Sequence, residues 1–283
     1  MMSSFALRRV MPVLAVAGLF SGALLTGCSS KNDDKLGLST DMASLPPDRL
    51  YNAGVDSLQT QRYADAVKRF DAVEQNYPYS TWSTKAQLMH GYAEYKQGDY
   101  TDAIAALERY IELHPSNTDT PYAYYLRGLC YYEQISDIER DQANTQKAMD
   151  ALTDVVTRYP DTDYARDARL KIDLCRDHLA GKEMAVGRWY ENQHLYVAAL
   201  DRFQTVISNY QTTNHTPEAL ERTTEIYIAM GLPEQAKQTA AVLGYNYPGN
   251  EWYQKAYSLL VDNGVVPDKN GKTQKPGFFA RIF

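Results

Sequence analysis

The sequence predicts an all-α protein built from repeated helix-turn-helix units, and three observations lead to that prediction. A glycine, an alanine and a proline follow one another at intervals of twelve residues, and the set recurs thirty-seven residues later. Apolar side chains within a unit have helical spacing, as Tyr63, Ala66 and Phe70 do. No segment shows the apolar-polar alternation of a strand. We expect five such units across residues 47–250, forming a solenoid.

Four marker positions define the units. The small residue of the first helix is Gly54, Gly91, Gly128 or Gly187, with Thr224 in the fifth unit. The small residue of the second helix is Ala66, Ala103, Ala148, Ala199 or Ala236. A larger apolar residue follows four positions later: Phe70, Leu107, Leu152 or Phe203, with Ala240 as the exception. The residue that ends the unit is Pro78, Pro115, Pro160 or Pro248, with Gln211 in the fourth unit. Small residues allow helices to approach closely, and proline stops a helix.

This order of markers resembles the tetratricopeptide repeat, with about three residues added to the usual period of about 34. Gly98 and Gly231 fall between the two helices of a unit, where a left-handed cap is expected. The alanine and proline of the third unit arrive eight residues late, which predicts an insertion near residues 135–144.

The third and fourth units are further apart than the others. The gap from Pro160 to Gly187 is twenty-seven residues instead of thirteen. The excess is about four helical turns. Because this is close to a whole number of turns, apolar residues before and after the extra segment lie on the same face of one helix. We therefore expect one long connecting helix over residues 163–192. The residues expected to continue its apolar face are Leu170, Leu174, Cys175, Leu179 and Val186.

The first twenty-eight residues have the pattern of a lipoprotein leader. An uncharged apolar run from Val10 to Leu25 follows Arg8 and Arg9, and it is shorter than the roughly 20 residues of a membrane helix. The run ends in Leu-Thr-Gly-Cys, which resembles the lipobox of bacterial lipoproteins, so Cys28 is the expected lipidation site. The alternative is an ordinary secretory cleavage site with an unrelated cysteine. Ser29 favours retention at the outer membrane, because aspartate at this position commonly retains such lipoproteins at the inner membrane.

Composition and motifs argue against several functional classes. A net charge of −6 and a pI near 5.4 do not fit a nucleic-acid-binding protein. No histidine lies in a zinc-protease motif, and neither a nucleophile elbow nor a phosphate-binding glycine loop is present, so we expect no enzyme, no cofactor and no metal. Cys175 and His178 are interpreted as a core cysteine beside a surface histidine. Cys130 and Cys175 are expected to be two buried thiols, with a disulfide as the alternative.

Tyrosine is strongly enriched, with 23 tyrosines against 7 phenylalanines. Many fall on the first helices of the second and third units, which line one side of a helical solenoid. About half are expected to pack between helices, and the rest to form a wall for an extended peptide, because a tyrosine ring packs while its hydroxyl stays hydrated. The residues proposed for this groove are Tyr77, Tyr92, Tyr95, Tyr122, Tyr125 and Arg127.

Three strings carry a closer resemblance: Asn-Tyr-Pro-Tyr-Ser at 76–80, Arg-Tyr-Ile-Glu-Leu-His-Pro at 109–115 and Tyr-Leu-Arg-Gly-Leu at 125–129. Together with the lipobox and the repeats, they resemble the BamD (ComL) family of outer-membrane lipoproteins over residues 28–250. The resemblance implies a lipid-anchored scaffold on the periplasmic face of the outer membrane, which binds BamA and unfolded outer-membrane proteins. It also allows contacts with other lipoproteins of the β-barrel assembly machinery. Arg202 matches a family arginine implicated in the BamA contact.

The expected organisation has five parts: a leader (1–27), a tether (28–46), a substrate-side half with repeats 1 to 3 (47–161), a BamA-side half with the long helix and repeats 4 and 5 (162–262), and a tail (263–283). The tail has Lys269, Lys272, Lys275 and Arg281 against Asp268, and it ends in Phe-Phe-Ala-Arg-Ile-Phe. It is expected to be a disordered terminus, with docking into a partner or into the chain's own groove as the alternative. The second functional hypothesis is a periplasmic scaffold for peptidoglycan enzymes or other envelope proteins.

Overall fold

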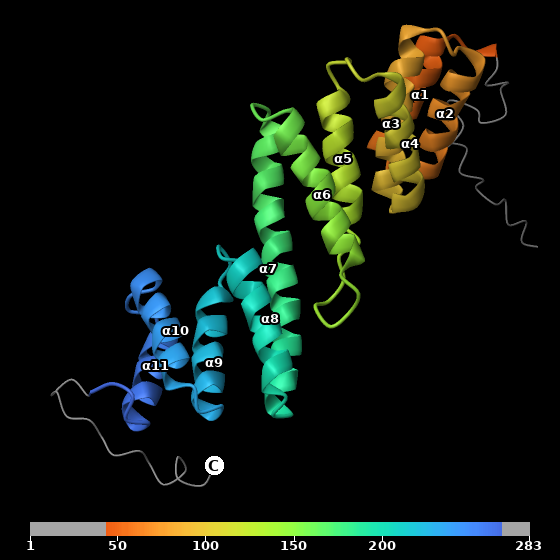
Figure 1. Ribbon diagram of the computed structural model, residues 1–283. Helices are drawn as coiled ribbons and strands as arrows, with labels where there is room; N and C mark the ends of the chain where they lie inside the picture. Colours follow the sequence, from red (N-terminus) through yellow and green to blue (C-terminus); the bar gives the residue numbers. More distant parts are fainter. Residues whose placement is uncertain (1–43, 268–283) are drawn as a thin grey trace, which may run out of the picture. The chain divides into compact units, whose positions relative to one another are not determined.

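A computed structural model describes residues 44–267, and helices account for most of that range (Figure 1). Within it the eleven helices are α1 (Pro47–Gln59), α2 (Tyr63–Asn76), α3 (Thr81–Gln97), α4 (Tyr100–Leu113), α5 (Thr120–Tyr132), α6 (Ala143–Arg158), α7 (Asp163–Asn192), α8 (Tyr196–Asn209), α9 (Thr216–Ala229), α10 (Pro233–Asn246) and α11 (Glu251–Asp262). The all-α prediction is confirmed. The leader, Cys28, most of the tether and the tail beyond Pro267 lie outside the described residues.

The helices stack in chain order as helix-turn-helix pairs. Each helix packs against the next one in the sequence, and alternate helices also touch, as α3 does with α5 and α5 with α7. The first helices of successive pairs therefore lie side by side, and they are the odd-numbered helices of Figure 1. No helix within residues 44–267 combines the length and the apolar character that crossing a bilayer requires.

Complementary side-chain volumes hold each pair together. The marker alanines of the second helices are fully buried. A Cβ atom on any of the four marker glycines would lie 2.5 to 2.9 Å from the large apolar side chain of the second helix. These pairs are Gly54 with Phe70, Gly91 with Leu107, Gly128 with Leu152 and Gly187 with Phe203. Repeat 5 has the reverse arrangement, because buried Thr224 takes the glycine position and buried Ala240 the position of the large residue.

Turn residues end the helices where the markers predict. Gly98 and Gly231 have φ angles of 91° and 72°, as expected for left-handed caps. Gln61 and His194 adopt φ angles of 58° and 59° at the corresponding turns of repeats 1 and 4. The four marker prolines are exposed and directly follow the residues that cap α2, α4, α6 and α10.

The long helix α7 has the bounds expected from the repeat spacing. The Thr162 side chain caps its first turn by accepting a hydrogen bond from the Ala165 amide at 3.2 Å. The predicted insertion is the loop 133–142 between α5 and α6. Two contacts hold this loop against α7: His178 Nε2 lies 2.8 Å from the Ser136 carbonyl oxygen, and Lys182 Nζ donates to the Glu139 carbonyl oxygen at 2.9 Å.

Part of the predicted apolar face of α7 is wrong. Cys175 and Leu179 are buried, but the Leu170 and Leu174 side chains are 65% and 58% exposed. The core face of α7 follows Ala165, Ala168, Ile172, Cys175 and Leu179, at alternating steps of three and four. Leu170 is two residues, or about 200°, from Ala168, so it lies on the opposite side of the helix.

Candidate functional site

Five tyrosines from three helices form one surface, which we call the tyrosine surface: Tyr92 and Tyr95 of α3, Tyr122 and Tyr125 of α5, and Tyr164 of α7. The Tyr164 ring lies 5.5 Å from the Tyr122 ring and is stacked at 5.4 Å on the Tyr125 ring. Tyr92, Tyr95 and Tyr122 pack against the core shared by α3, α4 and α5. The odd-numbered helices therefore place a row of rings from α3 to the start of α7, all half-buried except the exposed Tyr164.

Carboxylates fix the orientation of two of these rings. The Tyr95 hydroxyl donates to Glu133 Oε1 at 3.4 Å, and the Tyr125 hydroxyl donates to Asp167 Oδ2. Burial, with Glu133 nearby, raises the pKa of Tyr95 to about 12. Burial and the contact with Asp167 also raise the pKa of Tyr125. Both hydroxyls therefore stay protonated at neutral pH, and the rings present neutral, pre-oriented apolar faces.

The structure does not bring Tyr77 and Arg127 to this surface. The Tyr77 hydroxyl donates to the Leu45 carbonyl oxygen at 2.8 Å and so holds the segment before α1. Arg127 pairs with Asp154 of α6 at 3.0 Å and with Glu108 of α4 at 3.7 Å, so it bridges second helices. Arg127 therefore points to a different side of α5 from Tyr122 and Tyr125, and its role in binding a peptide stays a prediction.

The surface continues along α7 into a depression that we call the leucine groove, lined by Leu170, Leu174, Asp177, Ile135, Ile138 and His215. It consists of two adjoining pockets of about 430 and 520 Å³ that share Leu174 and Asp177. The floor comes from α7, one wall from the loop 133–142, and the other from the segment 212–215 before α9. Exposed leucines in a depression form an apolar site available to another chain segment.

Sequence reasoning missed Tyr164 and the outward-facing leucines. Tyr164 stands alone at the start of α7, and nothing local links it to Tyr122 and Tyr125 about forty residues earlier. A signal for the leucines did exist, because the spacing of Ala165, Ala168 and Ile172 already defines a different face of α7.

Arg202 lies on α8 and is partly occupied within the chain. Its Nη1 atom donates to Glu183 Oε2 of α7 at 3.1 Å, and its side chain remains 39% exposed. This hydrogen bond raises the pKa of Arg202, so the guanidinium stays charged. Arg202 is a fixed cation at the junction of α7 and α8 that has room for a second partner.

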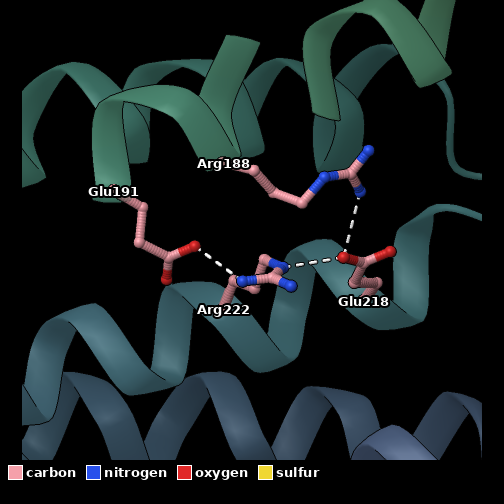
Figure 2. A network of polar contacts seen from close by, with 4 residues as sticks. All are labelled: Arg188, Glu191, Glu218 and Arg222. Atoms are coloured by element: carbon pink, nitrogen blue, oxygen red, sulfur yellow. Dashed lines mark hydrogen bonds and ion pairs between the residues drawn. The ribbon is translucent and has the colours of Figure 1, made fainter. Parts of the chain in front are cut away.

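A network of ion pairs joins α7 to α9 (Figure 2). Arg222 of α9 lies between Glu191 at 2.7 Å and Glu218 at 2.7 Å, and Arg188 of α7 reaches Glu218 at 3.0 Å. Burial opposes ionisation of Glu218, but hydrogen bonds from Arg222 and Arg188 prevail and lower its pKa. The network fixes repeat 5 on the long helix through charged side chains.

Glu221 lies next to this network, and its buried carboxyl group should make the free energy of unfolding depend on pH. Burial and the nearby Glu225 raise its pKa to about 7, against smaller opposing effects of Arg222 and Lys255. Folded Glu221 therefore keeps its proton between about pH 4.5 and 7 while the unfolded chain loses it, so this group's stabilisation falls as pH rises through that window. We expect Glu221→Gln to raise the free energy of unfolding at pH 8 by the order of 1–3 kcal/mol, and by progressively less towards pH 4.5.

Urea denaturation from pH 4.5 to 8 measures this effect. Glu234→Gln, at an exposed position of α10, is the matched control and should show no comparable pH-dependent gain. A gain for Glu221→Gln that is equal at pH 4.5 and pH 8 would contradict the assignment.

The thiols and histidines show no arrangement for catalysis among the described residues. Cys130 and Cys175 are both buried and free, and burial raises their pKa values to about 12 and 11. His178 Nε2 lies 2.8 Å from the Ser136 carbonyl oxygen of the loop 133–142. Ligand atoms of Asp71, Glu74 and His90 lie within 4.8 Å of one another, but Arg109 already binds Glu74 at 2.9 Å and opposes a cation there.

Comparisons with known proteins agree with the family resemblance of the sequence. The family described as "YfiO: Outer membrane lipoprotein" matches residues 43–243. A protein of Caulobacter vibrioides named outer membrane protein assembly factor BamD is 48% identical over 256 residues, which cover 90% of this chain and 83% of the relative. Proteins of the same name from Rickettsia prowazekii and Neisseria meningitidis serogroup A are 44% and 32% identical, covering 87% and 83% of this chain and 96% and 92% of the relatives. The chain therefore belongs to the BamD family of outer membrane lipoproteins.

Proposed function

We propose that this protein is a lipid-anchored, non-enzymatic scaffold of outer-membrane protein assembly, which holds unfolded β-barrel proteins for a BamA partner. The observation that supports this role most strongly is the tyrosine surface, which leads into the leucine groove. Family membership supports the assembly role, since the relatives are named assembly factors. The free energy of binding is the only driving force that this mechanism uses.

The tyrosine surface suits an unfolded barrel segment for physical reasons. Such a segment is extended and alternates apolar and polar side chains, so one of its faces can lie on the tyrosine rings. The rings are already oriented by Glu133 and Asp167, so binding costs little side-chain entropy. Aromatic contacts adapt to many sequences, which a scaffold for many clients requires.

The second part of the proposal concerns anchoring and assembly. Cys28 would carry the lipid that holds the protein at the periplasmic face of the outer membrane, and residues 28–46 would connect it to α1. The BamA contact would involve Arg202 and the helices of repeats 4 and 5. Metabolic labelling with radioactive palmitate tests the anchor: the wild-type chain should be labelled and Cys28→Ala should not.

Equilibrium binding tests the tyrosine surface. We expect Tyr95→Ser combined with Tyr125→Ser to weaken binding of a urea-denatured, fluorescently labelled barrel protein about tenfold, because two anchored rings are lost. The control is Tyr79→Ser with Tyr245→Ser, which removes two tyrosines that are 101% and 88% exposed on other surfaces. Fluorescence anisotropy with the full chain measures both affinities.

Partial unfolding of the double variant must be distinguished from loss of the surface. Leu170→Ser with Leu174→Ser changes only exposed side chains, so it should leave the thermal unfolding midpoint unchanged and still weaken binding. Unchanged affinity in both the tyrosine and the leucine variants would overturn the proposed site.

A further inference from the structure

The leucine groove presents exposed apolar side chains with acidic groups at its edge. Leu170 and Leu174 are more than half exposed. The loop 133–142 along one wall contains four carboxylates and a single cation, Arg140. Asp173 and Asp177, at the groove's edge, keep 67% and 43% of their side chains exposed. An apolar site with acidic edges fits a segment that combines large apolar residues with Lys and Arg.

The same chain contains a segment of that composition. Residues 268–283 have four cations against one carboxylate, and the last six include Phe278, Phe279, Ile282 and Phe283. Residues 44–267 have 21 Lys and Arg against 31 Asp and Glu, so the repeats attract this segment electrostatically.

The segment starts close enough to reach the groove. The Tyr257 hydroxyl of α11 donates to the Pro267 carbonyl oxygen at 2.9 Å, which places the last described residue on α11. Helix α11 packs against α9, and His215, the residue before α9, lines the groove. Packed helix axes lie about 10 Å apart, so the path from α11 across α9 to α7 is about 20 Å. Following α9 along its length adds about 21 Å. Sixteen residues span up to about 50 Å.

We propose that residues 268–283 dock in the leucine groove and compete there with unfolded barrel segments. The competition, though not the docking, rests on the proposed substrate surface. The phenylalanines would cover Leu170 and Leu174, and the lysines would lie along Asp173, Asp177 and the acidic loop. Tethering supplies an effective concentration of the order of millimolar, so weak intrinsic affinity is enough to close the groove until a client displaces the segment.

A labelled peptide tests the docking directly. A fluorescein-labelled peptide of residues 268–283 is titrated with the intact chain and with a chain that ends at Pro267. We expect the truncated chain to bind the peptide at least tenfold more tightly, because the intact chain already contains the competitor. Equal affinity of the two chains, or no binding to the truncated chain, would overturn the proposal.

Two controls separate groove binding from general attraction. In the truncated chain, Leu174→Asp should weaken peptide binding at least tenfold, whereas Leu113→Asp, at a leucine of matching exposure on α4, should not. A peptide with its three phenylalanines and Ile282 replaced by serine keeps all four cations and should lose binding. Unchanged or tighter peptide binding by Leu174→Asp, or full binding of the serine peptide, would show charge attraction alone and contradict docking.

A client titration keeps this proposal distinct from the proposed function. The truncated chain should bind a urea-denatured barrel protein several-fold more tightly than the intact chain. If truncation has no effect while Tyr95→Ser with Tyr125→Ser still weakens client binding, the tail proposal fails and the substrate surface stands. If neither change alters client binding, the proposed function fails as well.

Discussion

Phe203→Ala is expected to lower the free energy of unfolding by about 3–5 kcal/mol, because the Phe203 side chain is completely buried between α7 and α8. Gly187→Thr is expected to cost at least about 1–3 kcal/mol alone, because a Cβ atom at Gly187 would lie 2.5 Å from the Phe203 ring. In combination the two changes should cost at least about 1 kcal/mol less than their sum, since the threonine occupies space that the phenylalanine leaves.

The side-chain pair of repeat 5 is the reason to expect this coupling. Thr224 and Ala240 lie thirty-seven residues after Gly187 and Phe203, and both are buried. The double variant therefore gives repeat 4 the side-chain pair that repeat 5 already contains. Urea denaturation of all four chains measures the coupling. Phe70→Ala with Gly187→Thr, which changes residues of two separate repeats, is the control and should be additive within about 0.5 kcal/mol. If the free-energy costs of Gly187→Thr and Phe203→Ala also add, the proposed exchange of volumes is contradicted.

Arg202→Glu is expected to weaken binding of the BamA periplasmic domain about 10- to 100-fold. Arginine is a frequent hot-spot residue in protein interfaces. Reversing its charge removes an attractive contact and adds repulsion from the partner's acidic groups. The effect on stability should be small, about 1 kcal/mol or less, because the pair with Glu183 is partly exposed. Surface plasmon resonance with immobilised BamA domain measures the affinity.

A charge swap separates the two roles of Arg202. Combining Arg202→Glu with Glu183→Arg restores an ion pair between α7 and α8 with its polarity reversed. If Arg202 contacts BamA, the swapped protein still binds weakly. Recovery of wild-type affinity in the swapped protein would show that Arg202 serves only the internal pair, and it would remove this residue from the proposed contact.

The helical architecture was predictable because the repeat markers are local. Glycines, alanines and prolines at fixed offsets report helix approach and helix ends, and the spacing excess between Pro160 and Gly187 predicted the bounds of α7. Each marker glycine contacts the large residue sixteen or twenty-four positions later. The sequence indicates this contact in repeat 5, where both positions change together: Thr224 replaces the glycine and Ala240 replaces the large residue.

The surface was only partly predictable because it depends on which way each side chain faces. Helix α7 has apolar residues on two faces, and composition alone does not say that Leu170 and Leu174 face outward while Ile172 and Cys175 face the core. Arg127 is close to Tyr125 in sequence yet bonds to second helices. The pairing of Tyr164 with Tyr122, and the network between α7 and α9, depend on packing between repeats, which no local pattern encodes.

Site-specific photo-crosslinking in cells tests most directly whether unfolded barrel proteins lie on the tyrosine surface. A benzophenone amino acid replaces Tyr95, Leu174 or, as the control, Tyr245, which is 88% exposed on α10. We predict crosslinks to newly secreted outer-membrane proteins from positions 95 and 174, and none above background from position 245. Crosslinks of equal yield at all three positions, or none at 95 and 174, would contradict the proposed scaffold surface.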